Sequence, residues 1–143
     1  MAVILVTHDL GVVANYTDEI AVMYAGRLVE KAPTRTLFSN MKMPYTKALM
    51  RSIPKLDLPS HTRLDTIPGR PPDLIHPPRG CRFAPRCANA RERCTEEEPP
   101  LLAADSPDHT YACWYPVGSP EYREREEELK RLDSRVLAAE EVG

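Results

Sequence analysis

The distribution of proline is the feature that most limits how this chain can fold. Seven of its 15 prolines lie between Ile53 and Arg79. Neither a helix interior nor a central strand tolerates that density. We therefore expect residues 53–79 to form a semi-extended connector. The apolar core must then be built from the segments on either side of it.

The segment before the connector begins with an apolar run. Residues 2–7 are mostly small and branched apolar residues, a pattern typical of a parallel strand that is buried on both faces. Asp9 is a suitable N-cap for a short helix that extends to about Tyr16. A strand covered on both faces needs neighbouring strands on both sides. We therefore expect residues 1–52 to be the C-terminal remnant of a larger α/β domain.

The next residues predict a β-hairpin. Apolar and polar residues alternate over residues 19–24, and the chain returns over residues 27–31 after a tight Ala-Gly turn. Short helices are expected near Pro33 and after Pro44. The alternation places three apolar residues on one face of the first strand: Ile20, Val22 and Tyr24.

The segments after the connector differ from it in composition. Residues 80–116 contain all four cysteines and predict a small, irregular cysteine-rich module. Residues 117–143 are highly charged and predict a helix with Ser119 as N-cap and Pro120 at its first position. Two ion pairs are expected on its surface, each with the glutamate four residues before the basic residue, which is the favourable order: Glu126 with Lys130, and Glu127 with Arg131.

Composition argues against two classes of function. The formal net charge is -2, from 19 basic and 21 acidic residues, so there is no basic excess that would indicate nucleic-acid binding. No apolar run is long enough for a transmembrane helix. We therefore expect an intracellular chain with no nucleic-acid partner.

His8 directly follows the predicted first strand. In open α/β sheets, ligands bind outside the carboxyl ends of the strands. A histidine at that place can donate a hydrogen bond to a phosphate oxygen. It can equally be a turn residue between Thr7 and Asp9, and the three residues alone leave both interpretations open.

The four cysteines allow several interpretations. Five, six and eighteen residues separate Cys81, Cys87, Cys94 and Cys113 in turn. Two disulfides, buried free thiols, a zinc site in which His109 replaces one cysteine, and a [4Fe–4S] cluster are all compatible with this spacing. The spacing matches neither the short zinc knuckles nor the common ferredoxin runs, so it does not decide between them.

Longer stretches of the sequence resemble a known family. The stretch "ILVTHDLGVVANYTDEIAVMYAGRLVEKA" resembles the end of the nucleotide-binding domain of ABC transporters. "PTRTLFSNMKMPYTKALMRSIP", residues 33–54, resembles the continuation found in importers of dipeptides and oligopeptides. This resemblance implies that His8 is the switch histidine, which contacts the γ-phosphate of ATP. The fold it implies for residues 1–52 is the end of a P-loop-type domain: strand, short helix, hairpin and short helices.

Three motifs that ATP hydrolysis requires are absent from the sequence. There is no G-x-x-x-x-G-K-[ST] phosphate loop, no Gly-rich signature motif, and no apolar run that ends in Asp-Glu. ATP and Mg²⁺ are therefore expected only in the complete subunit. The parent family hydrolyses ATP, but we expect this chain alone to be inactive.

The cysteine segment resembles the C-terminal extension of the same importers. The stretches that carry the resemblance are "GCRFAPRC", "EEEPPL" and "ACWYP". The resemblance implies a [4Fe–4S] cluster bound by Cys81, Cys87, Cys94 and Cys113, with zinc as the alternative cofactor.

The resemblance also implies a function and partners. The chain is expected to be a C-terminal fragment of the ATP-binding subunit of an ABC importer for dipeptides, oligopeptides or nickel. Its partners would be a second ATP-binding subunit, two transmembrane permease subunits and, through them, an extracytoplasmic solute-binding protein. Its place would be the cytoplasmic face of the membrane. The alternative is a stand-alone iron–sulfur or zinc module that acts in protein interactions.

Overall fold

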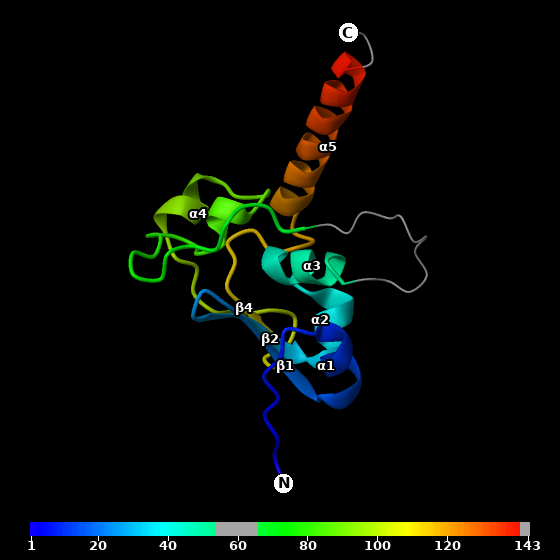
Figure 1. Cartoon of the computed structure of the whole chain (residues 1–143), viewed down its shortest axis with the longest axis vertical. Coiled ribbons are helices and arrows are strands. Elements are labelled where there is room, and N and C mark those ends of the chain that lie inside the picture. The colour runs from blue at the N-terminus through cyan, green and yellow to red at the C-terminus, as the bar shows by residue number, and fades with distance from the viewer. Residues whose placement is uncertain (54–65, 141–143) are drawn as a thin grey trace.

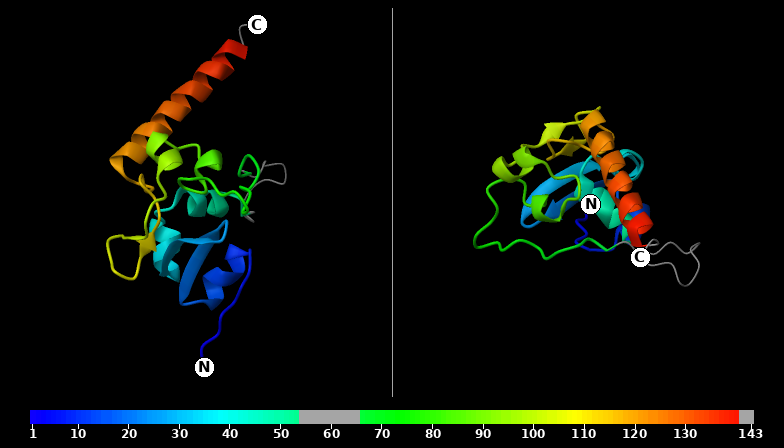
Figure 2. Two further views of the ribbon diagram at one scale, coloured as in Figure 1. Left: turned by 90° about the vertical axis from the view of Figure 1, so that its left-hand side faces the viewer. Right: turned by 90° about the horizontal axis from the view of Figure 1, so that it is seen from above.

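The computed structural model describes residues 1–53 and 66–140, with side chains described as far as residue 134. Figure 1 shows α5 extending away from the body of the molecule, while the N-terminal segment points the opposite way. Figure 2 confirms this arrangement from a second side. The described elements, in chain order, are α1 (Leu10–Tyr16), β1 (Glu19–Tyr24), β2 (Arg27–Pro33), α2 (Thr34–Asn40), α3 (Pro44–Arg51), the 3-10 turn η1 (Ala84–Arg86), α4 (Glu92–Glu96), β3 (Leu102–Ala103), β4 (Thr110–Tyr111) and α5 (Pro120–Glu140).

The predicted hairpin is confirmed. β1 and β2 pair in antiparallel fashion and are joined at Ala25 and Gly26, whose φ angles are 48° and 77°. Two consecutive positive φ angles are the mark of the tight turn whose twist matches that of the strands. The register shifts between Val22 and Met23, where the ladder has a bulge or irregularity. The face predicted to be apolar, with Ile20, Val22 and Tyr24, is buried.

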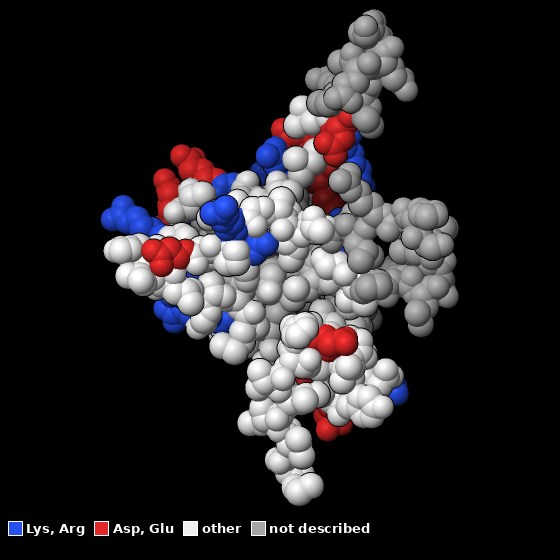
Figure 3. Space-filling model, in the orientation of Figure 1, with Lys and Arg blue, Asp and Glu red and all other residues white. Residues whose placement is uncertain are grey.

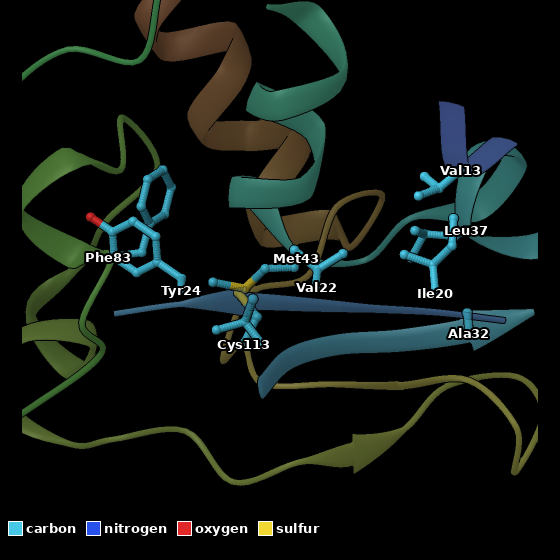
Figure 4. Packing of buried hydrophobic residues seen from close by; sticks show 10 residues of the cluster. Val13, Ile20, Val22, Tyr24, Ala32, Leu37, Met43, Phe83 and Cys113 are labelled. Atoms are coloured by element: carbon cyan, nitrogen blue, oxygen red, sulfur yellow. The ribbon is translucent and has the colours of Figure 1, made fainter. Parts of the chain in front are cut away.

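The core lies along this hairpin (Figure 4). At one end, Ile20 packs with Val13 of α1 and Leu37 of α2. At the other end, the ring of Tyr24 lies 5.3 Å from that of Phe83, which belongs to the cysteine-containing segment. The core therefore contains residues from both sides of the connector.

The sheet also continues across the connector. β2 pairs with β4 through Glu30 with Tyr111 and Lys31 with Thr110, and β4 pairs with β3. The strand order is β1-β2-β4-β3. Residues 66–79 contain no helix or strand, as the prolines predicted, whereas residues 54–65 lie outside the described residues.

The N-terminal ends of α1 and α5 lie where the sequence predicted them. The Asp9 carboxylate accepts hydrogen bonds from the backbone N–H groups of Gly11 and Val12, at 2.9 and 3.2 Å, so the predicted N-cap is confirmed. At the start of α5, the hydroxyl oxygen of Ser119 accepts a hydrogen bond from the N–H of Tyr122 at 3.2 Å. Both caps were predicted from residue type alone.

One surface pair of α5 differs from the prediction. Glu127 pairs with Arg131 at 3.7 Å as expected. Glu126 instead forms its ion pair with Lys47 of α3, at 2.7 Å, rather than with Lys130. The first turns of α5 contact α3, since Nζ of Lys47 lies 4.8 Å from the centre of the Tyr122 ring, and Tyr122 is only 4% exposed.

The strand predicted for residues 2–7 is wrong for this chain. Residues 1–7 have no regular structure, and the side chains of Ile4 and Val6 are both 92% exposed. A strand needs a partner for its backbone N–H and C=O groups. Among the described residues, no strand pairs with this segment.

Glu30 of β2 is completely buried and joins three segments of the chain. Its Oε1 lies 2.8 Å from Nε2 of His109, which is 1% exposed. The same oxygen accepts a hydrogen bond from the N–H of Lys42 at 2.5 Å, and Oε2 accepts one from the N–H of Met43 at 3.1 Å. The carboxylate thus ties β2 to the α2–α3 connection and to the loop before β4.

Replacing Glu30 with alanine should lower the free energy of unfolding by about 3 kcal/mol or more. The change removes the acceptor of two backbone N–H groups and the partner of a buried imidazole, and unsatisfied buried groups are costly. Urea unfolding followed by circular dichroism measures this. Glu19→Ala is the matched control, because exposed Glu19 has Lys31 as its one ion-pair partner among the described residues, and its loss should cost about 0.5 kcal/mol. If Glu30→Ala and Glu19→Ala lowered the free energy of unfolding by equal amounts, this account of Glu30 would be contradicted.

Candidate functional site

All four cysteine side chains line one cavity. Cys81 and Cys87 are partly buried, Cys94 and Cys113 are buried, and all four are free thiols. They come from different elements: the loop before η1, the residue after η1, helix α4, and the strand end after β4. Thiolates are ligands that soft metals and iron–sulfur clusters prefer, so the four residues are candidate ligands by residue type.

Backbone contacts hold the cysteine loops together. The N–H of Cys81 donates to the carbonyl oxygen of Cys94 at 2.8 Å, and the N–H of Cys87 donates to that of Ala84 at 3.2 Å. A Cβ atom added at Gly80 would collide with the backbone of Cys94 and Thr95. Only glycine therefore allows the two loops to approach this closely.

Arg86 fixes the loops against the end of the connector. Its Nε donates to the carbonyl oxygen of Pro68 at 2.9 Å and its Nη2 to that of Ile67 at 3.0 Å. Its Nη1 lies 3.3 Å from the hydroxyl of Tyr24. One guanidinium thus connects η1, the connector and β1.

Two aromatic side chains that line the cavity also contact arginines. Trp114 and Tyr115 both line the cavity. The guanidinium carbon of Arg93 lies 3.6 Å from the centre of the Trp114 ring, and that of Arg91 lies 5.2 Å from the Tyr115 ring. Figure 3 shows basic and acidic side chains side by side on this part of the molecule, around α4 and its neighbouring loops.

Burial raises the pKa of three of the four thiols. It raises the pKa of the Cys87 thiol to about 12, and it also raises the pKa values of Cys81 and Cys113. Backbone N–H groups oppose this rise at each sulfur; at Cys81 they belong to Phe83 and Ala84. Hydrogen bonds of this kind stabilise a thiolate, the form that binds metals.

The structure places the two candidate histidines away from the cysteine cavity. His8 is exposed in the bend before α1 and does not line the cavity. His109, the alternative zinc ligand, also does not line it and is paired with Glu30 instead. Within residues 1–53 and 66–140, no group of three or more His, Cys, Asp or Glu side chains is arranged so that it could hold a metal ion.

Sequence reasoning missed the roles of Glu30 and Arg86. Glu30 lies beside buried Val29, and Ala32 is buried as well, so simple alternation does not describe β2. The sequence of β2 also contains Arg27 and Lys31, so Glu30 does not stand out as a buried residue, and its partner His109 is 79 residues away. No local pattern identifies such a pair.

Comparison with known proteins gives consistent matches. Residues 29–94 match the family described as the C-terminal region of oligopeptide/dipeptide transporters. The oligopeptide transport ATP-binding protein OppD of Mycobacterium tuberculosis is 49% identical over 111 residues, which are 78% of this chain and 18% of that protein. The dipeptide transport ATP-binding protein DppD of Bacillus subtilis is 47% identical over 115 residues, 80% of this chain and 33% of that protein.

Residues 29–94 thus match the C-terminal region of oligopeptide/dipeptide transporters. A further relative, OppD of Salmonella typhimurium, is 46% identical over 116 residues, 81% of this chain and 34% of that protein. The matched part of the chain thus spans about a third or less of the length of these relatives. The family match includes Cys81, Cys87 and Cys94, while Cys113 lies after it.

None of the helices within residues 1–53 and 66–140 combines the length and the apolar character needed to cross a bilayer.

In the metal-free chain, Cys87 should resist alkylation at pH 8. With a pKa of about 12, its thiolate is about 1,000-fold rarer at pH 8 than that of a thiol whose pKa is near 9, and only the thiolate reacts. Its reaction rate should then rise about tenfold per pH unit until the pH reaches the pKa. Iodoacetamide labelling followed by peptide mass spectrometry measures this, with the urea-unfolded chain as control. Equal rates in the folded and unfolded chains at pH 8 would contradict the prediction.

Proposed function

We propose that this chain is the C-terminal part of the ATP-binding subunit of an ABC importer for oligopeptides, dipeptides or nickel. The observation that carries this proposal is the identity of 46 to 49% to relatives named as ATP-binding proteins of oligopeptide or dipeptide transport. The helix α1, the β1–β2 hairpin and the helices α2 and α3 support it, because they follow the order that the resemblance implied.

In the proposed complete subunit, His8 contacts the γ-phosphate of ATP. Two observations support this role. The side chain of His8 is exposed, and the carboxylate of the neighbouring Asp9 caps α1, so the imidazole is the group that can reach a phosphate. An imidazole at this place can stabilise charge on the transferred phosphoryl group. The sequence of this chain lacks the phosphate loop, the signature motif and the catalytic carboxylates. ATP and Mg²⁺ therefore belong to the complete subunit, and this chain alone does not hydrolyse ATP.

The second part of the proposal is a [4Fe–4S] cluster bound by Cys81, Cys87, Cys94 and Cys113. Support comes from the donor set, since four thiols line one cavity and N–H groups point at the sulfurs of three of them. In a cube each thiolate binds its own iron, so the four sulfurs need not share one ion. When bound, the cluster would supply four iron–thiolate bonds that cross-link the loops. A zinc ion is the alternative occupant.

The partners in this proposal belong to the whole transporter. They are a second ATP-binding subunit, two transmembrane permease subunits and, through these, an extracytoplasmic solute-binding protein. The subunit would lie at the cytoplasmic face of the membrane as a peripheral protein. A stand-alone iron–sulfur or zinc module remains the competing interpretation, which the relatives' names do not favour.

The cysteine centre is the part of the proposal that this chain can test by itself. Protein purified without oxygen should be brown and contain about four irons and four acid-labile sulfides per chain. Cys94→Ser and Cys113→Ser should each lose most of both. Thr95→Ser, which keeps a hydroxyl beside Cys94, is the matched control and should retain them. Iron, zinc and sulfide analysis together with a visible spectrum measures this.

Two results would contradict the cluster. A colourless protein with about one zinc per chain would replace it with a structural zinc site. A colourless, metal-free protein in which the serine variants behave as the unaltered chain does would remove the metal centre altogether.

A further inference from the structure

Residues 2–7 form an apolar stretch without a partner, which we call the N-terminal segment. It contains no charged residue and no proline. The side chains of Val3, Ile4 and Val6 are 77%, 92% and 92% exposed. Residues 1–6 form no backbone hydrogen bond with any residue that the structure describes. Short uncharged segments of high β propensity are those that pair most readily with an exposed strand edge.

The outer edge of β1 is the second feature without a partner. β1 pairs with β2 on one side, and no other strand of the described ranges lies on its other side. Outside the ladder with β2, residues 19–24 form no backbone hydrogen bond with the rest of the described chain. The strand carries one charge, at Glu19, and no proline. Natural edges are usually blocked by charges, prolines or a covering segment, so this edge is open to another strand.

The N-terminal segment and β1 match in length and in side-chain pattern. Each contains six residues. In a strand placed beside β1, alternate side chains point to opposite faces of the sheet. One set would extend the buried face formed by Ile20, Val22 and Tyr24. The other set would lie on the opposite face beside Met23, which is 62% exposed. A segment that is apolar at every alternate position therefore suits this place.

The N-terminal segment leads away from β1 of its own chain. Figures 1 and 2 both show it extending beyond the body of the molecule. It runs directly into α1, which is fixed in the core because Val13 is 7% exposed and packs with Ile20 and Leu37. Parallel neighbours in one chain need a crossover connection of a dozen or more residues, whereas residues 8–18 join the segment to β1. A second copy of the chain can supply the missing edge without this constraint.

From these observations, we propose that two copies of this 143-residue chain exchange their N-terminal segments. Residues 2–7 of each copy pair with the free edge of β1 in the other copy. The two pairs are related by symmetry, so the contact closes as a dimer. Main-chain hydrogen bonds and burial of the apolar side chains stabilise it. The exchange goes beyond the proposed function and needs neither ATP nor the cysteine centre, because residues 2–7 and 19–24 do not line the cysteine cavity.

Size-exclusion chromatography with light scattering tests the proposal on the full chain. Between about 1 and about 200 µM, the mass should change from that of a monomer to that of a dimer, with a dissociation constant on the order of 10 µM. Hydrogen exchange followed by peptide mass spectrometry is the second measurement. The N–H groups of residues 2–7 should be protected at the concentrations where the dimer forms and unprotected in the dilute monomer.

Variants locate the contact. Ile4→Pro should weaken dimerisation at least about tenfold, because proline removes an N–H group from the new ladder. Met23→Lys, which places a charge beside the free edge, should also weaken it. Leu74→Pro is the matched control and should dimerise as the unaltered chain does, because Leu74 is equally an exposed aliphatic residue but lies in the stretch 66–79, which has no helix or strand. Circular dichroism of each variant confirms that it is folded.

Several outcomes would overturn the proposal. It fails if the chain stays monomeric up to about 200 µM, or if Ile4→Pro and Leu74→Pro dimerise equally well. It also fails if residues 2–7 exchange as fast in the dimer as in the monomer. Protection of these residues in a monomer would show that the segment pairs within its own chain. Assemblies that grow beyond the dimer would show an open contact and would overturn the symmetric exchange.

Discussion

The buried carboxylate of Glu30 is the interaction on which the arrangement of this molecule depends. It accepts hydrogen bonds from two consecutive N–H groups before α3 and lies against the buried ring of His109. These groups belong to three segments that are distant in sequence. A buried charge is tolerated only when it is fully paired, so the three segments must keep their places together. The position of β4 beside β2 follows from this requirement.

The cysteine cavity is a consequence of that arrangement. Cys113 comes two residues after the end of β4, so the pairing of β4 with β2 determines where its thiol lies. The other cysteines are placed by short loops, by the close approach at Gly80 and by the hydrogen bonds of Arg86. The rings of Tyr24, Tyr45 and Phe83 pack together between the hairpin, α3 and these loops. A change in the hairpin is therefore expected to reach the thiols.

Local features of the fold could be predicted from the sequence, whereas contacts between distant segments could not. Alternation identified the hairpin, and residue types identified the caps at Asp9 and Ser119, because these signals depend on neighbouring residues. The strand predicted for residues 2–7 failed because a strand depends on a partner, and none of the described strands supplies it. The cysteines were recognised as a group, but their common cavity depends on the Glu30–His109 pair, which no periodicity reveals.

The central claim is that the hairpin and the cysteine-containing segment form one cooperative unit held by Glu30. Native-state hydrogen exchange at increasing urea concentration tests it most directly. The N–H of Ala112, which donates to Val29, should exchange with the same opening free energy as the N–H groups of the β1–β2 ladder. As urea increases, both sets of N–H groups should then exchange through the same global unfolding reaction. Exchange of Ala112 at a clearly lower free energy, with the hairpin still protected, would contradict the claim.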